Sequence, residues 1–367
     1  MEFDIEDFLR KAVAIGASDV HLAVGEHPTV RKDGRILKIN MPVLTDDDVD
    51  RAYDALLPRS AKDNLDNVYD LDFAYEIPGV SRFRVNLSRQ LGKNKLVIRL
   101  IPYYVPKITE LNLPSSIEQF AKLNHGLVLV TGPTGAGKST TIASIIDYIN
   151  ASFPKHIITI EDPIEFIFNN KKCIISQRQI LLDTATFPDG VKYALRQDPD
   201  VIFIGEIRDR ETITSAMKAA ETGHLVFATI HTNDAVQTVS RIINMFEPSD
   251  RDVIRSQLSS LLRGTISQKL VPLKDGAGRR PACEVLVVTS TVKDFIQKDQ
   301  LDNIYDLVKK GTFNSMITMN MSLYNMYANG LISEEVAMEF SDDKTELAQM
   351  MKGVFRGSQD PLEDDGF

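Results

Sequence analysis

The stretch Leu127-Val-Leu-Val-Thr-Gly-Pro-Thr-Gly-Ala-Gly-Lys-Ser-Thr-Thr141 decides the expected fold. The apolar residues at its start predict a buried strand, and isoleucines at 142, 145, 146 and 149 predict one face of a following helix. Between them, Gly132 to Ser139 match G-x-x-x-x-G-K-[ST], a loop whose backbone N–H groups cradle phosphates. This order of strand, loop and helix places phosphates at the helix N-terminus, where the helix dipole favours anions.

Further apolar runs also end in polar residues. Ile157 to Ile160 precede Glu161 and Asp162, Val201 to Ile204 precede Gly205 and Glu206, and Leu225 to Ile230 precede His231. Buried apolar runs separated by helical stretches indicate a parallel α/β sheet. Ligands bind such sheets beyond the carboxyl ends of the strands, so we expect these polar groups to converge on the phosphate loop.

The expected ligand is ATP with Mg²⁺, because phosphoryl transfer to water needs neutralised phosphates and an oriented water. Lys138 is expected to reach the terminal phosphates, and the Ser139 hydroxyl to hold the metal. The full set of candidate nucleotide-binding residues is Gly132, Pro133, Thr134, Gly135, Ala136, Gly137, Lys138, Ser139 and Thr140.

Two carboxylates are available for the remaining tasks. Glu206 follows an apolar strand where a Walker B acid is expected, with Gly205 at the usual aspartate position, and is predicted to hold Mg²⁺ partly through water. Glu161 is the candidate general base, supported by Asp162 and Glu165.

Other interpretations of these side chains remain open. Either acid could cap the next helix or pair with Arg208. His231 is expected to donate to the γ-phosphate, although a single histidine is often structural, and His224 before the same strand is a less favoured candidate.

The N-terminal part shows another pattern. Apolar positions in residues 3–15 predict a helix, and short alternating segments after it predict a small antiparallel sheet. In the segment 82–89, alternation places Arg82 and Arg84 on the face opposite Phe83, Val85 and Leu87. With Arg99 on a later segment, these arginines are candidates to approach the nucleotide or, alternatively, solvated surface residues.

Proline content and charge set the domain limits. Three prolines between Pro102 and Pro114 mark a linker, and the last residues hold one arginine against four acids. We therefore expect an N-terminal domain at 1–105, a linker at 106–114, an ATPase domain with C-terminal helices at 115–353, and a disordered acidic tail at 354–367.

Composition narrows the function classes. The 367 residues carry a net charge of −9, which argues against a protein that coats nucleic acid or anionic lipid. The N-terminus is acidic and the apolar runs are short, so we expect a cytoplasmic protein with no membrane-spanning helix. Cys173 and Cys283 are far apart in the sequence and predict neither a disulfide framework nor a cysteine zinc site within one chain.

A family resemblance rests on motifs in the same order. Gly132 to Thr141, Ile158 to Glu165, Leu195 to Asp209 and Glu221 to Thr232 resemble the Walker A, Asp, Walker B and His boxes of the secretion ATPase superfamily. The segments Ala17 to Leu22 and Ser81 to Asn86 resemble, more narrowly, the type IV pilus retraction ATPases, the PilT and PilU family.

The resemblance implies a fold, an assembly and a cellular task. It implies a RecA-like P-loop ATPase domain preceded by a smaller α+β PAS-like domain, in a ring-shaped homo-hexamer. It also implies that ATP hydrolysis disassembles a pilus at the cytoplasmic face of the inner membrane. The implied partners are the platform protein, with a second retraction ATPase as a further candidate, and no nucleic acid. The family further implies that Arg82, Arg84 and Arg99 approach the nucleotide.

One segment departs from the family pattern. Retraction ATPases typically carry a segment like Ala-Ile-Arg-Asn-Leu-Ile-Arg-Glu in the C-terminal region, whereas this chain has Thr291-Val-Lys-Asp-Phe-Ile-Gln-Lys298. An accessory role like that of PilU therefore stays open. From other function classes, a RecA-like nucleic acid translocase and a nucleotide-binding regulator without hydrolysis also remain alternatives.

Overall fold

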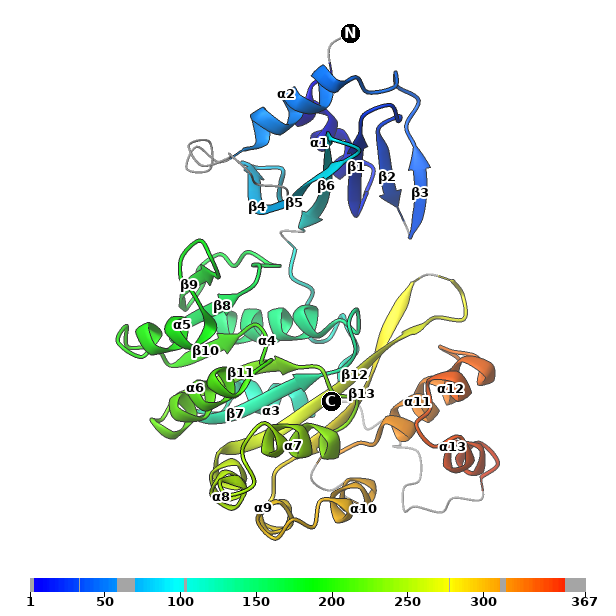
Figure 1. Ribbon diagram of the computed structural model, residues 1–367. Coiled ribbons are helices and arrows are strands. Elements are labelled where there is room, and N and C mark those ends of the chain that lie inside the picture. Colours follow the sequence, from blue (N-terminus) through cyan, green and yellow to red (C-terminus); the bar gives the residue numbers. More distant parts are fainter. Residues whose placement is uncertain are drawn as a thin grey trace. The chain divides into compact units, whose positions relative to one another are not determined.

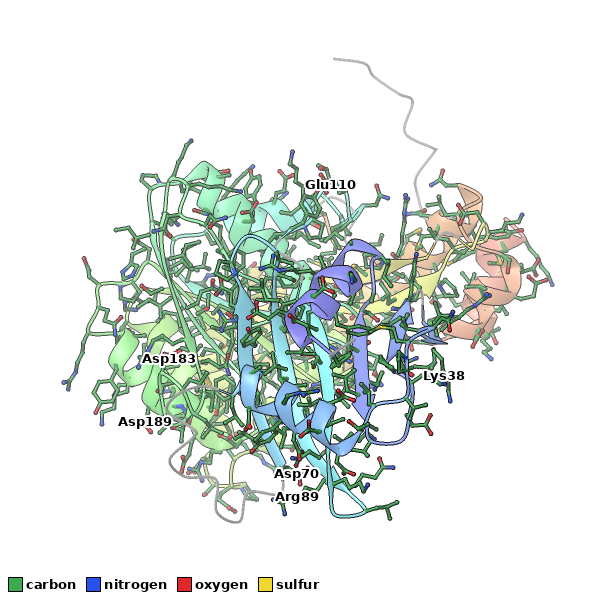
Figure 2. All side chains as sticks on the ribbon, turned by 90° about the horizontal axis from the view of Figure 1, so that it is seen from above. Lys38, Asp70, Arg89, Glu110, Asp183 and Asp189 are labelled. Atoms are coloured by element: carbon green, nitrogen blue, oxygen red, sulfur yellow. The ribbon has the colours of Figure 1, made fainter. Side chains whose placement is uncertain are left out.

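The computed structural model describes residues 3–32, 34–57, 70–101, 104–276, 278–310 and 315–353 (Figure 1). The chain forms two compact units, Met1–Tyr104 and Val105–Phe367, and each is described by itself. Ile108 and Leu113, within the expected linker at 106–114, are buried in the core of the second unit. The expected tail at 354–367 lies outside the described residues. Charged side chains such as Lys38, Arg89 and Asp183 are exposed (Figure 2).

The first unit is an antiparallel sheet with two helices. Its described strands lie in the order β3-β2-β1-β6-β5-β4, which confirms the expected small antiparallel sheet. Helix α2 and strand β4 were not anticipated from the sequence. The elements are α1 (Ile5–Ala14), β1 (Asp19–Ala23), β2 (Thr29–Lys32), β3 (Arg35–Lys38), α2 (Asp46–Leu56), β4 (Asp70–Ile77), β5 (Ser81–Gln90) and β6 (Lys93–Ile101).

Alternation along β5 sets the two faces of this sheet. Phe83, Val85 and Leu87 are buried in one core with apolar residues of α1 and α2, while the intervening side chains are half-buried on the opposite face. Leu91 and Gly92 join β5 to β6, and both have positive φ, 53° and 77°. Two left-handed residues match the twist of a tight two-residue hairpin.

The second unit is a mostly parallel sheet in the order β13-β12-β7-β11-β10-β8-β9, with only the β12–β13 pair antiparallel among its described strands. Its strands are β7 (Gly126–Thr131), β8 (His156–Glu161), β9 (Ile174–Gln179), β10 (Val201–Ile204), β11 (Leu225–Ile230), β12 (Leu262–Pro272) and β13 (Arg279–Val287). Its helices are α3 (Ser116–Ala121), α4 (Lys138–Ser152), α5 (Phe187–Ala194), α6 (Arg210–Glu221), α7 (Ala235–Asn244), α8 (Arg251–Leu261), α9 (Ser290–Gln297), α10 (Asp302–Lys310), α11 (Met319–Ala328), α12 (Glu334–Phe340) and α13 (Lys344–Met351).

Helices cover both faces of this sheet (Figure 1). Val128 and Val130 of β7 belong to a core shared with α3 and α4, whereas Leu127 and Leu129 belong to a core shared with α5 to α10. Helices α11 to α13 form a separate apolar cluster with Val271 and Ala282 of the β12–β13 hairpin. The α/β class expected from the sequence is confirmed. Among the described residues, no helix combines the length and apolar character needed to cross a membrane.

Candidate active site

The expected site residues follow neighbouring parallel strands. Strands β7, β11, β10 and β8 are consecutive in the sheet, so their carboxyl ends share one edge. Lys138 Nζ lies 3.5 Å from His231 Nδ1, and His231 Nε2 lies 3.0 Å from Glu206 Oε1. Glu161 ends β8 at the same edge. The structure thus joins Lys138, His231 and Glu206 by contacts, and it places Glu161 at the end of the strand next to the one that precedes Glu206.

The phosphate loop adopts a conformation that depends on glycine. Gly135 and Gly137 have φ of 81° and 86°, in the left-handed region that favours glycine. Pro133, Thr134 and Gly135 are exposed, while Ala136 is buried. Ser139 and Thr140 lie half-buried in the first turn of α4, where backbone N–H groups have no partner within the helix. The loop can therefore present these donors to an anion.

The Lys138 side chain is folded onto its own loop. Its buried amine donates to the carbonyl oxygens of Gly132 at 2.9 Å and Pro133 at 3.0 Å. Burial lowers the pKa of Lys138, while the negative charges of Glu206 and Glu165 oppose that shift. The amine lies between the loop and the acids, which is where a terminal phosphate would need a cation.

Each carboxylate oxygen of Glu206 contacts a basic side chain. Arg208 Nη2 lies 2.7 Å from Oε2, and His231 lies at Oε1. Burial would raise the pKa of Glu206, but the hydrogen bond and charge of Arg208, together with His231 and Lys138, bring it below its ordinary value. The acid is ionised at neutral pH. The Arg208 pairing that the sequence left open is present, and it accompanies the histidine contact.

Gly205 explains why the usual Walker B aspartate is missing. A Cβ at this position would lie 3.2 Å from both Glu161 Cα and the Ile160 carbonyl oxygen. These distances are tighter than ordinary Cβ contacts, so a side chain here would require the backbone of β8 to shift by a few tenths of an ångström. The glycine therefore permits the close approach of the two strands that carry the candidate acids.

Glu161 has the surroundings of a carboxyl that titrates near neutrality. It is 6% exposed, and burial raises its pKa to about 7 despite hydrogen bonds that favour the ionised form. Thr159 Oγ1 donates to Oε1 at 2.7 Å, and Gln177 Nε2 donates to the same oxygen at 3.3 Å. A base of this pKa is matched to catalysis near pH 7.

Of the residues predicted to support Glu161, Glu165 contacts it directly, whereas Asp162 lies near Arg208. The backbone N–H of Glu165 donates to Glu161 Oε2 at 3.5 Å, and the charge of Asp162 acts on Arg208. His224, by contrast, precedes β11 and lies at the opposite end of the strand from His231. Its Nδ1 lies 3.0 Å from the Ala219 carbonyl oxygen, a contact with the end of α6.

The three candidate arginines all belong to the first unit. Arg84 on β5 and Arg99 on β6 face each other across the ladder. Arg99 Nε pairs with Asp19 at 2.9 Å, and Arg84 Nε lies 3.7 Å from an oxygen of Asp72. Arg82 is half-buried near the start of β5, two positions before Arg84. Their approach to a nucleotide stays a prediction from the family resemblance.

A buried residue beside the loop escaped the sequence analysis. The Gln268 amide on β12 donates to the Ala136 carbonyl oxygen at 2.6 Å and accepts from the Thr141 hydroxyl at 2.8 Å. The only sequence signal for it is a short polar run, Ser267 to Lys269, between the apolar residues Ile266 and Leu270. That signal does not indicate which loop it contacts.

The donors near the loop suit one type of cation. Among the described residues, no group of three or more His, Cys, Asp or Glu side chains could hold a metal ion. The Ser139 hydroxyl and the ionised Glu206 carboxylate remain as oxygen donors on this edge. Mg²⁺ is commonly bound through one or two protein oxygens together with substrate phosphates and water, so this donor set fits it.

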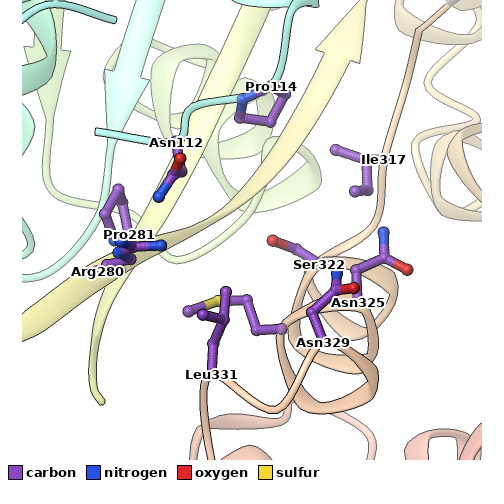
Figure 3. A pocket seen from close by; sticks show the side chains of 10 residues that line it. Asn112, Pro114, Arg280, Pro281, Ile317, Ser322, Asn325, Asn329 and Leu331 are labelled. Atoms are coloured by element: carbon purple, nitrogen blue, oxygen red, sulfur yellow. The ribbon is translucent and has the colours of Figure 1, made fainter. Parts of the chain in front are cut away.

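A cavity of about 400 Å³ lies elsewhere in the second unit (Figure 3). It is lined by Asn112 and Pro114, by Arg280 of β13, and by residues of α11 such as Ser322 and Asn325. The guanidinium of Arg280 donates to the side-chain oxygen of Asn112. This contact attaches the segment before α3 to the hairpin, and the cavity is separate from the residues of the phosphate loop.

Comparison with known proteins identifies relatives over nearly the whole chain. Residues 1–337 match the family described as "Type II/IV secretion system protein". The chain is 42% identical over 337 residues to the type IV pilus retraction ATPase PilT of Pseudomonas aeruginosa, covering 92% of this chain and 97% of that protein. It is 37% identical to the type IV pilus ATPase PilU of the same organism, covering 96% and 92%. A crystal structure of the pilus retraction motor PilT with bound ADP matches with a TM-score of 0.89 and 43% identity, covering 95% of this chain and 100% of that one.

Proposed function

The chain belongs to the family of type II/IV secretion system ATPases, and we propose that it is the ATP-hydrolysing motor that retracts a type IV pilus. The observation that carries this proposal is the chain of contacts from Lys138 through His231 to Glu206 at the edge where Glu161 ends β8. Relatives that are named as pilus retraction ATPases provide the specific task.

The site suits phosphoryl transfer to water. The loop amides and the Lys138 amine hold the phosphates, and Glu161 takes a proton from the attacking water. His231 donates toward the γ-phosphate when its contact with Glu206 opens. Mg²⁺, held by Ser139 and partly through water by Glu206, would neutralise phosphate charge. These roles are supported by the shared edge and by the raised pKa of Glu161, about 7.

Arginines of the first unit complete the proposal. Arg82, Arg84 and Arg99 would supply positive charge to the nucleotide, a contribution worth about 10³–10⁵ in rate for related phosphoryl transfers. Because these arginines and the phosphate loop belong to different compact units, their engagement would couple domain motion to hydrolysis.

We further propose the assembly and the location of the motor. It acts as a homo-hexamer at the cytoplasmic face of the inner membrane, contacts the platform protein of the pilus machinery, and can work beside a second retraction ATPase. We propose no nucleic acid partner, because the net charge of −9 would repel the phosphates of a nucleic acid.

A second candidate function is the accessory role of PilU. The segment with altered charges falls on α9, where Val292 and Ile296 are buried and Phe295 packs against the same core, while Thr291, Asp294 and Gln297 are exposed. The apolar spacing of the helix is therefore retained, and the chain is also similar to PilU over 96% of its length. Hydrolysis would be unaffected in this case, but retraction would require a partner ATPase.

One assay separates the function classes. Purified full-length protein is tested for Mg²⁺-dependent phosphate release from ATP, with and without single-stranded DNA, beside the Lys138→Ala variant. The motor hypothesis predicts turnover that DNA leaves unchanged and that Lys138→Ala abolishes. Strong stimulation by DNA would favour a translocase, and no turnover in the unmodified protein would favour a regulator without hydrolysis.

A further inference from the structure

We propose that Gln268 is a positioning residue of this ATPase, which braces the phosphate loop from the adjacent strand β12. The inference rests on the proposed function to the extent that the loop binds nucleotide. Gln268 lies outside the four sequence boxes that carry the family resemblance, and it contacts the loop rather than the reacting atoms.

The sheet register places Gln268 beside the loop. Strand β12 runs parallel to β7, and Ser267 lies opposite Thr131, the last residue of β7 before the loop begins. The hydroxyls of Thr131 and Ser267 are hydrogen-bonded at 3.0 Å, which holds the two strand ends together. The next residue on β12, Gln268, therefore lies at the level of the loop and on the other face of its strand.

Both ends of the Gln268 amide are used. Its Nε2 donates to the Ala136 carbonyl oxygen at 2.6 Å, and its Oε1 accepts from the Thr141 hydroxyl at 2.8 Å. The Ala136 carbonyl oxygen can only accept, so the N–H group of the amide must face the loop and Oε1 faces the Thr141 hydroxyl. The residue is 1% exposed, so water does not replace either bond easily.

The loop is also shaped around this residue. A Cβ on Gly132 would lie 2.3 Å from the backbone oxygen of Gln268, and a Cβ on Gly137 would lie 2.9 Å from its Nε2. Both distances are shorter than real Cβ contacts allow. The first and last glycines of the motif thus pack against one residue of β12, and that residue holds the loop between them.

The consequence concerns nucleotide affinity. Without the amide, the Ala136 carbonyl is buried without a partner, which favours a rearranged loop. A rearranged loop presents its N–H groups poorly to phosphates. Since Gln268 does not contact the transferred group, its loss should raise KM and the Kd for nucleotide much more than it lowers kcat.

Two variants and one control test this role in the full-length protein. Gln268→Met keeps the length and volume of the side chain and removes both hydrogen bonds. Gln268→Glu keeps the shape, and when protonated it can still donate to Ala136, but when ionised it cannot. Thr265→Val is the matched control, because the Thr265 hydroxyl is buried on the same strand and makes no hydrogen bond to any residue that the structure describes.

The measurement is the Kd for Mg²⁺·ADP by titration calorimetry at pH 6 and pH 8, with thermal melting to verify folding. We expect Gln268→Met to raise Kd about tenfold, which is the size expected when the buried hydrogen bond to the loop is lost. Thr265→Val should change Kd less than about twofold. For Gln268→Glu, the ratio of its Kd to that of the unmodified protein should be larger at pH 8 than at pH 6, because burial keeps the acid protonated at the lower pH.

Three outcomes would contradict the role proposed for Gln268. If both Gln268 variants fold and bind ADP within twofold of the unmodified protein at both pH values, the bracing role is wrong. If Gln268→Met fails to fold, a pH-independent ratio for Gln268→Glu would overturn it. Failure of the unmodified protein to bind ADP would overturn the proposed function and this inference together, and so differs from failure of the inference alone.

Discussion

The Nε2 atom of His231 lies 3.0 Å from Oε1 of Glu206, and this contact assigns the ring proton. Burial and the nearby Lys138 charge lower the pKa of His231, so the ring is neutral at pH 7. Because Glu206 is ionised and only accepts, Nε2 carries the proton, and Nδ1 accepts on the side of Lys138 Nζ, 3.5 Å away. The ring therefore joins the loop lysine to the strand-end acid.

Removal of this ring should affect turnover more than binding. We expect His231→Ala to lower kcat about 10²-fold, because a donor directed at the transferred group is lost, while the Kd for ADP changes little. His125→Ala is the control, since His125 is exposed. Phosphate release and titration calorimetry give the two quantities, and an unchanged kcat would show that His231 is only structural.

Substitution of the candidate base should separate binding from hydrolysis. Glu161→Gln keeps the shape of the side chain and can no longer take a proton, so we expect turnover to fall about 10²–10⁴-fold with ADP affinity retained. Glu221→Gln, at an exposed position at the end of α6, serves as the control. Turnover of Glu161→Gln at the rate of the unmodified protein would contradict the assignment.

The pH profile of hydrolysis follows from the same carboxyl. Burial raises the pKa of Glu161 to about 7, and only the ionised form can act as a base. We therefore expect kcat to fall about tenfold for each pH unit below that value and to level off above it. Initial rates between pH 5.5 and pH 9 test this. A rate that stays flat through pH 7 would exclude Glu161 as the base.

A second buried acid should make the fold less stable at high pH. Burial raises the pKa of Glu284 from 4.5 to about 7, although its Oε1 accepts from the Ala235 N–H at 2.8 Å. Between these pH values the folded chain binds the proton more tightly than the unfolded chain, so stability from this group is present below pH 4.5 and falls as pH rises to about 7. The shift corresponds to roughly 3 kcal/mol.

Replacement of Glu284 by glutamine should remove that penalty. Glutamine can still accept from the Ala235 N–H and carries no charge, so we expect the melting temperature at pH 8 to rise by about 5 °C. Well below pH 4.5, the difference should vanish because the acid is then protonated in both the folded and the unfolded chain. A variant that melts lower than the unmodified protein at pH 8 would show that the charge is not costly.

Local patterns in the sequence predicted the strand, the glycine-containing loop and the helix that the structure has between Gly126 and Ser152. The glycine and lysine positions between Gly132 and Lys138 define both a backbone shape and a chemistry, and the apolar runs predict parallel strands. Parallel strands bring the residues that follow them to one edge of the sheet; there the structure has His231 in contact with Glu206, and Glu161 at the end of the neighbouring strand. Their catalytic roles remain predictions.

Contacts between distant segments were beyond the sequence. Gln268 lies 132 positions from Ala136, and nothing local indicates that β12 pairs beside β7. Burial of Ile108 within a proline-rich stretch likewise depends on tertiary packing. Helix α2 did have a local signal, because Thr45 and Asp48 form a capping box, but its run of aspartates hides the helical period.

Pilus retraction in cells tests the central claim most directly. The gene is deleted in the source organism, and pilus number and retraction are measured with and without a copy encoding the unmodified protein or Lys138→Ala. The account predicts excess surface pili that do not retract, with recovery from the unmodified copy and none from Lys138→Ala, whose loop has lost its phosphate-binding amine. Normal retraction after deletion, or full recovery with Lys138→Ala, would contradict it.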